Sequence, residues 1–202
     1  MKKLGLLAML ATFIVASGTA SAALVYQLDT PAGTWGNVSL SQATSGNATF
    51  NADSVDIAVT LTSPGQFVST GGHFTFTFNL PTTFSISGVT SGYTAQAANG
   101  SYVQAGFGTF NGAIQCTGCG NGGSSPVGST LNFTVTATSA ITPNSFTTGT
   151  GTTAHFTADI LNGTTFVVGD SGHTSTVPEP ISLSLVGGGL LALGLFRKRF
   201  VA

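Results

Sequence analysis

Charged side chains are nearly absent from this sequence, at 5% of 202 residues, where an ordinary soluble domain carries roughly a quarter. Residues 23 to 176 contain no lysine, arginine or glutamate. A body without cations cannot neutralise phosphates, which excludes nucleic-acid binding through basic contacts and nucleotide chemistry that relies on a phosphate-gripping Lys or Arg. Serine and threonine, with 21 and 32 copies, must keep the surface hydrated instead.

Catalytic side chains are equally scarce. The carboxylates between residues 23 and 176 are Asp29, Asp53, Asp56, Asp159 and Asp170. Without glutamate, only aspartate is left for the paired carboxylates of a glycosidase, and the body has no lysine for a Schiff base and no Gly-x-Ser-x-Gly elbow. We therefore expect no enzymatic activity, and a hydrolase with an unrecognised site is the last hypothesis.

One short string imitates a catalytic motif. Gly169-Asp170-Ser171-Gly172 resembles the tetrapeptide around the nucleophile of trypsin-like serine proteases, and His155 precedes it by 16 residues. Geometry rather than a string defines a triad. We expect no rigid shell to hold these groups within reach of one another, so we do not interpret them as a triad.

The N-terminus has the three parts of a secretory signal peptide. Lys2 and Lys3 give a positive start, residues 4–16 are apolar, and Ala20-Ser21-Ala22 supplies small residues for signal peptidase. We predict a signal peptide over 1–22, with cleavage between Ala22 and Ala23. The protein is then exported across the inner membrane.

At the C-terminus, residues 177–202, the order is reversed, and the positive residues follow the apolar run instead of preceding it. Val177-Pro178-Glu179-Pro180 precedes an apolar run over 181–196, and Arg197-Lys198-Arg199 follows. At about 1.5 Å per residue this run makes roughly 24 Å of helix, short of the ~30 Å hydrocarbon core. Positive residues prefer the cytoplasmic side, so we expect a transient transmembrane helix with the body outside.

These C-terminal residues resemble the PEP-CTERM protein-sorting domain of Gram-negative bacteria. The resemblance covers 177 to about 200 and rests on the ordered Val-Pro-Glu-Pro motif, Gly-containing apolar helix and basic tail. It implies recognition of Pro178, Glu179 and Pro180 by an exosortase, which processes the chain in the inner membrane, and a setting of exopolysaccharide and biofilm matrix. A plain single-span anchor is the alternative.

The body alternates apolar and polar residues in several runs, which indicates strands with one buried face. The clear runs are 54–61, 73–80, 131–138 and 155–160, and the weaker ones are 24–28, 84–89, 102–107 and 164–168. No window shows a helical stripe. We predict an all-β domain over 23–170, an antiparallel β-sandwich of jelly-roll or immunoglobulin-like type, followed by a flexible stalk over 171–176.

Cys116 and Cys119 are the chain's two cysteines. In an exported protein two cysteines usually pair, so we favour a disulfide. A redox motif would need a helix after the first cysteine, and the glycine-rich sequence after Cys119 does not favour one. A zinc site needs about four ligands; both alternatives stay open.

Ligand sites are harder to predict. Trp35, Tyr93 and Tyr102 are the candidate aromatics for stacking on sugar rings, against ordinary packing in a core. We predict no cofactor, although Asp53 with Asp56, or Asp159 with Asp170, could join a structural calcium site, which wants six to eight oxygens.

The sequence thus predicts a non-enzymatic protein of the cell surface or extracellular matrix, sorted by an exosortase. Its body would be a structural or adhesive component of exopolysaccharide or biofilm. A carbohydrate-binding module that uses the candidate aromatics is the second hypothesis.

Overall fold

A computed structural model describes residues 23–44, 50–119 and 123–177. Residues 23–176 form one compact unit. The predicted signal peptide, Pro178-Glu179-Pro180, the apolar run and the basic tail lie outside the described residues, while Ala23 and Val177 end strands. Among the described residues, no helix has the length and apolar character needed to cross a membrane.

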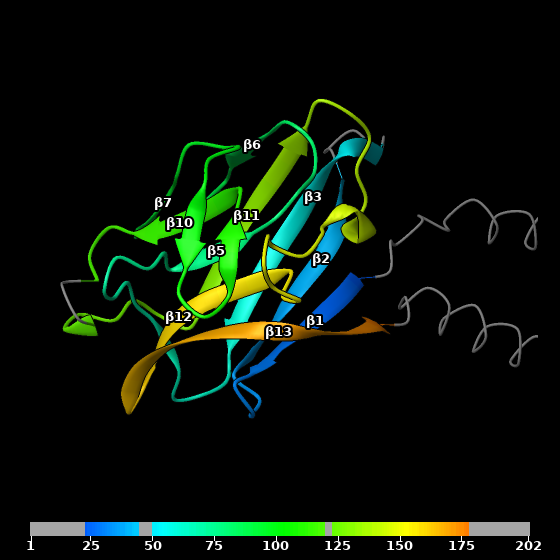
Figure 1. Ribbon diagram of the computed structural model, residues 1–202. Coiled ribbons are helices and arrows are strands. Elements are labelled where there is room, and N and C mark those ends of the chain that lie inside the picture. The colour runs from blue at the N-terminus through cyan, green and yellow to red at the C-terminus, as the bar shows by residue number, and fades with distance from the viewer. Residues whose placement is uncertain (1–22, 45–49, 120–122, 178–202) are drawn as a thin grey trace, which may run out of the picture. The chain divides into compact units, whose positions relative to one another are not determined.

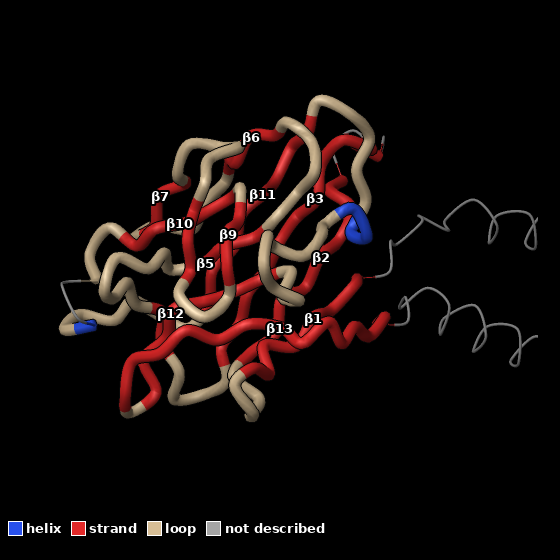
Figure 2. Tube along the Cα trace, viewed as in Figure 1, coloured by secondary structure: helices blue, strands red, loops and turns tan. Residues whose placement is uncertain are grey.

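The unit is built from antiparallel strands, which dominate Figures 1 and 2, so the all-β prediction is confirmed. The strands are β1 (Ala23–Thr30), β2 (Gly36–Thr44), β3 (Phe50–Leu61), β4 (Gln66–Phe67), β5 (Phe76–Phe78), β6 (Phe84–Ser87), β7 (Tyr93–Ala95), β8 (Tyr102–Gln104), β9 (Gly108–Phe110), β10 (Gly112–Cys116), β11 (Thr130–Ala137), β12 (Phe156–Asn162) and β13 (Thr164–Val177). A 3₁₀ turn, η2 (Pro143–Ser145), precedes β12.

Eleven strands form one sheet in the order β6-β11-β3-β2-β1-β13-β12-β5-β10-β7, with β4 beside β12; β8 and β9 pair separately. The sheet curves into a nearly closed, barrel-like arrangement. Phe78 of β5 lies near one end of this order, yet its ring centroid is 5.7 Å from that of Phe133 in β11 and 5.3 Å from that of Phe84 in β6. The two halves of the sheet therefore pack face to face over one core.

The core consists of the apolar members of the alternating runs. Val55, Ile57 and Val59 of β3 are buried, and their strand neighbours in β11 alternate in the same way. At roughly 25 cal/mol per Å² of apolar surface removed from water, this burial is the main stabilising term.

The run 73–80 behaves differently from the other alternating runs. Only Phe76–Phe78 form a strand, and all three residues are buried. The hydroxyls of Thr77 and Thr157 lie 2.5 Å apart in the interior. Both faces of β5 are covered, so Thr77 is a hydrogen-bonded core residue rather than a solvated one.

The segment 171–176 differs from the expected stalk. It continues β13 to Val177, and β13 is the neighbour of β1 in the sheet. The backbone N–H of Ser171 donates to Oδ1 of Asp29 in β1 at 2.8 Å. The folded unit therefore extends past residue 170 to residue 176.

Candidate functional site

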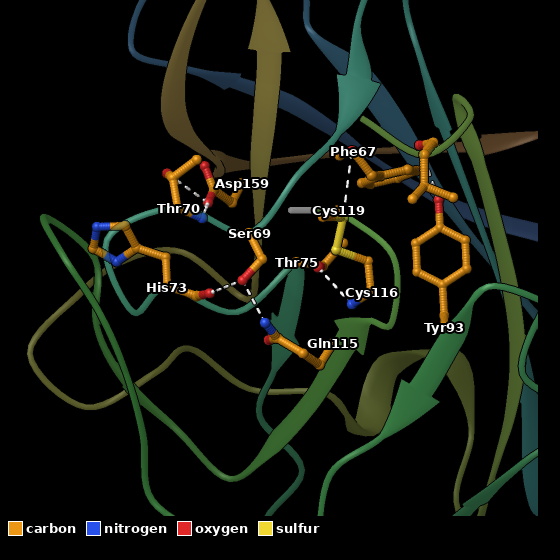
Figure 3. Close-up of a disulfide and its surroundings, with 11 residues drawn as sticks. Phe67, Ser69, Thr70, His73, Thr75, Tyr93, Gln115, Cys116, Cys119 and Asp159 are labelled. Carbon is orange, nitrogen blue, oxygen red and sulfur yellow. Dashed lines mark hydrogen bonds between the residues drawn. A yellow bond between two sulfur atoms is a disulfide. The ribbon is translucent and has the colours of Figure 1, made fainter. Parts of the chain in front are cut away.

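The structure joins Cys116, at the end of β10, to Cys119 in a disulfide with a Cα–Cα distance of 5.8 Å. Figure 3 shows the bond beside β4. Both cysteines are buried, and the Cys116 N–H donates to Oγ1 of Thr75 at 2.9 Å. This is the pairing that the sequence favours. The burial of both cysteines and the hydrogen bond of Cys116 to Thr75 are typical of a structural cross-link.

A partly buried polar cluster lies next to the disulfide (Figure 3). Oδ2 of Asp159 accepts hydrogen bonds from the N–H and hydroxyl of Thr70, at 2.5 and 2.8 Å. Gln115 donates from Nε2 to Oγ of Ser69. Oδ1 of Asp159 and Oε1 of Gln115 have no hydrogen-bond partner among the described residues. The cluster ties the loop after β4 to β10 and β12.

The environment of Asp159 determines its proton affinity. Burial raises the pKa of this carboxyl above its ordinary value, and the two Thr70 hydrogen bonds and the nearby His73 oppose that rise. Removal of the carboxyl from water penalises its charged form more than the Thr70 hydrogen bonds and the imidazole of His73 together offset.

Asp170 and His155 do meet, so the expectation that nothing rigid would hold these two together is wrong. Nδ1 of His155 lies 2.9 Å from Oδ2 of Asp170. The buried carboxylate also accepts the N–H groups of His155 and Phe156, both at 2.7 Å, and of Gly172 at 3.1 Å.

Ser171 does not complete a triad with this pair. Its hydroxyl donates to Oδ2 of Asp29 at 2.8 Å, and no hydrogen bond joins it to His155 among the described residues. Consecutive residues of a strand point to opposite faces, which places Asp170 inside and Ser171 outside. The His155–Asp170 pair therefore holds β12 to β13.

The candidate aromatics pack against their own chain. Tyr93 is buried, its ring lies edge-on to Phe67, and its hydroxyl donates to the Val127 carbonyl at 3.2 Å. Burial raises the pKa of Tyr93 to about 12. Tyr93 is therefore a core residue rather than a platform for sugar stacking.

Trp35 and Tyr102 are half-buried. Nε1 of Trp35 donates to the Pro31 carbonyl at 2.7 Å, and its ring packs edge-on to Phe166. Tyr102 donates to the Ala97 carbonyl and packs edge-on to Phe74. The polar atom of each ring is already used within the chain.

The carboxylates proposed for calcium are separated. Asp53 and Asp56 are three positions apart in β3 and so point to opposite faces. Asp159 and Asp170 bind different partners, Thr70 and His155. The described part of the chain holds no group of three or more His, Cys, Asp or Glu side chains placed for a metal.

The outward side of β2, β3, β11 and β6 is a continuous polar surface. We call it the polar face; its members include Ser39, Ser41, Asp56, Ala58, Ser87, Asn132 and Thr134. Strand register places Ser41, Asp56, Thr134 and Ser87 directly opposite one another, one from each strand. In the same way, Ser39, Ala58 and Asn132 form the next row.

A hollow of about 170 Å³ opens on the polar face, and Ser41, Asp56, Ala58, Gly88, Asn132 and Thr134 contribute to its lining. Ala58 and Gly88 leave space because their side chains are minimal. Oγ1 of Thr134 donates to Oδ1 of Asp56 at 2.6 Å, which fixes this exposed carboxylate at the edge of the hollow. Asp56 is the one carboxylate among the described residues of the lining.

Sequence reasoning identified three of the four strands of the polar face, β3, β11 and β6, but not the site. The available signal was the identity of the wet positions in 54–61 and 131–138, where Asp, Ala, Asn and Thr alternate with core residues. Strand register decides that these positions align, and β2 was not predicted.

No protein-family model matches the chain. No curated protein matches it. No solved structure matches it either. Functional inference therefore rests on the chain's own residues.

Proposed function

We propose that this chain is an exported protein of the cell surface or extracellular matrix, sorted by an exosortase, with a structural or adhesive role in exopolysaccharide or biofilm. Signal peptidase would remove residues 1–22. The exosortase would then process the chain at the inner membrane near Pro178-Glu179-Pro180, and the folded unit would remain outside the cell.

The observation that carries the proposal is the surface of the folded unit. Hydroxyl and amide groups, held in rows by strand register, make up most of the polar face, and residues 23–176 contain no lysine or arginine. Such a surface suits contact with hydrated, hydroxyl-rich material. The buried disulfide fits an oxidising compartment.

We also infer a sandwich-type fold, jelly-roll or immunoglobulin-like. The packing of Phe76 and Phe78 against Phe133, with centroids 5.8 and 5.7 Å apart, supports two facing layers. The hydrogen bonds that run on through β1 and β13 make the layers parts of one sheet.

A carbohydrate-binding module is the second candidate function. The hollow beside Asp56 favours it, whereas the burial of Tyr93 and the internal hydrogen bonds of all three candidate aromatics do not. In this function the polar face would do the binding through hydrogen bonds rather than ring stacking.

Intact mass spectrometry of the mature protein from its own host tests the proposal. A chain that starts at Ala23, ends between about Thr176 and Pro180, and gains about 2 Da on reduction is the expected result. A mass that still includes residues 181–202 would mean a retained anchor and would overturn sorting by processing. Cell fractionation checks the location separately.

A further inference from the structure

We propose that the hollow beside Asp56 on the polar face binds a single sugar ring of a neutral polysaccharide. The inference deepens the proposed function. It rests on that function because the proposed location outside the cell brings the protein within reach of a polysaccharide. The ligand class follows from the lining residues.

The hollow is built in advance of any ligand. Oδ1 of Asp56 is held by Thr134 at 2.6 Å. The backbone N–H of Asn132 donates to Oγ1 of Thr90 at 2.8 Å, and the Asn132 carbonyl accepts from the Thr90 N–H at 3.0 Å. Because these bonds fix the Asp56 carboxylate and the backbone of Asn132 before binding, less ordering cost falls on the complex.

The unused polar groups match the edge of a sugar. Among the described residues, Oδ2 of Asp56, the side-chain amide of Asn132 and the hydroxyl of Ser41 make no hydrogen bond within the chain. A carboxylate only accepts, an amide both accepts and donates, and a hydroxyl does either. Neighbouring hydroxyls of a sugar ring offer the complementary donors and acceptors.

Size limits the ligand to one ring. Asp56 and Asn132 are diagonal neighbours on adjacent strands, since Asp56 faces Thr134, and such positions lie about 7–8 Å apart. Two groups at that spacing can reach hydroxyls on opposite edges of one pyranose. The hollow of about 170 Å³ has room for several waters, which a ring would displace.

Charge excludes the competing ligands. An acidic polysaccharide or a phosphate would meet Asp56 with no lysine or arginine to offset it anywhere in residues 23–176. A calcium ion wants six to eight oxygens, several of them from carboxylates, and Asp56 is the one carboxylate among the described residues of the lining. A neutral, hydroxyl-rich chain satisfies the groups that are present.

Titration of the mature protein with neutral glucan, mannan and galactan oligosaccharides, followed by NMR and calorimetry, tests the site. We expect at least one of these neutral probes to bind. The largest NMR chemical-shift changes should occur at Ser41, Asp56, Ala58 and Asn132. Asp56→Asn should weaken binding about tenfold or more, because it replaces a charged acceptor. Ala58→Phe should abolish binding by filling the hollow.

Thr60→Ala is the matched control, since Thr60 is exposed in the same strand, outside the lining of the hollow; it should bind as the wild type does. Asn132→Ala gives a second loss-of-binding variant if Ala58→Phe does not fold. The inference would be overturned if none of the three neutral probes binds, or if Asp56→Asn and Ala58→Phe bind them as tightly as the wild type does. Preference for alginate, or loss of binding in EDTA, would also overturn it. If the mature mass and location are as proposed while the oligosaccharides fail to bind, this inference falls and the proposed function stands.

Discussion

At the residue scale, the buried carboxylate of Asp170 is hydrogen-bonded through both of its oxygens. It accepts three backbone N–H groups and Nδ1 of His155, all between 2.7 and 3.1 Å. Hydrogen bonds to a charged group contribute about 1.5–3 kcal/mol each. We expect Asp170→Asn, which keeps one acceptor oxygen, to lower the free energy of unfolding by about 2–4 kcal/mol.

Urea unfolding measures the Asp170 effect, and Asp56→Asn is its control. It removes the same charge at an exposed position, and the amide oxygen of the new asparagine can still accept the hydrogen bond of Thr134, so its effect should be about 0.5 kcal/mol or less. Equal stabilities of the two variants would contradict the assigned role of Asp170.

Asp159, also at the residue scale, has the opposite pH behaviour from a salt-bridged carboxylate. Burial raises its pKa above 3.8 in the folded state, so the folded chain holds this proton more tightly than the unfolded chain. The stability that protonated Asp159 contributes to the folded state is fully present below pH 3.8. It is lost as pH rises through the raised pKa. We expect Asp159→Asn, which cannot ionise, to remove this loss of stability.

Urea midpoints measured from about pH 4 to pH 7 test the linkage. The wild type should lose stability relative to Asp159→Asn as pH rises, and Thr60→Ala, which removes no titratable group, should keep the wild-type slope. Parallel curves for the wild type and Asp159→Asn would show that burial does not set the proton affinity of Asp159.

At the element scale, the pairing of β10 with β5 requires a residue without a side chain at position 112. A Cβ on Gly112 would lie 2.3 Å from the ring of Phe78, which is fully buried and cannot move aside. Gly112→Ala should lower the unfolding free energy by about 1–3 kcal/mol, as overpacking does. A Cβ at Gly118 meets nothing within 4 Å, so Gly118→Ala is the control in thermal unfolding, and equal melting temperatures would contradict the expected clash.

Strand prediction succeeded where one face is buried and the other is wet. Runs 54–61 and 131–138 correspond to β3 and β11. It missed β2, whose Val38 and Leu40 give a short signal, and it extended β5 too far because Thr75 and Thr77 alternate with phenylalanines yet are themselves buried. The local sequence pattern shows that a segment has the periodicity of a strand. Whether the second face of that strand is also buried depends on strands distant in the sequence.

The candidate site was less predictable than the strands. Tyr93 has an aromatic ring of the kind that stacks on sugars, but its position opposite Cys116 in the sheet buries it. Asp56 carries no local sign of importance. It lies beside Asn132 and Ser41 because β2 and β11 flank β3, and strand order of this kind is a property of the complete fold.

At the scale of the whole molecule, β13 closes the fold because it joins β1 to β12. The last residues of β13 belong to the sheet, and Ser171 binds Asp29 of β1 through its N–H and its hydroxyl, both at 2.8 Å. A chain that ends at Val177 should therefore unfold as the longer mature chain does. A chain that ends at Asp170 should lose about 2 kcal/mol or more, since two hydrogen bonds to a carboxylate and the ladder to β1 are removed. Calorimetry of the two chains decides between a strand and a stalk, because equal melting temperatures would show that residues 171–177 contribute nothing to the fold. Processing near Pro178 would then leave the sheet whole, whereas a cut at residue 170 would expose the edge of β1.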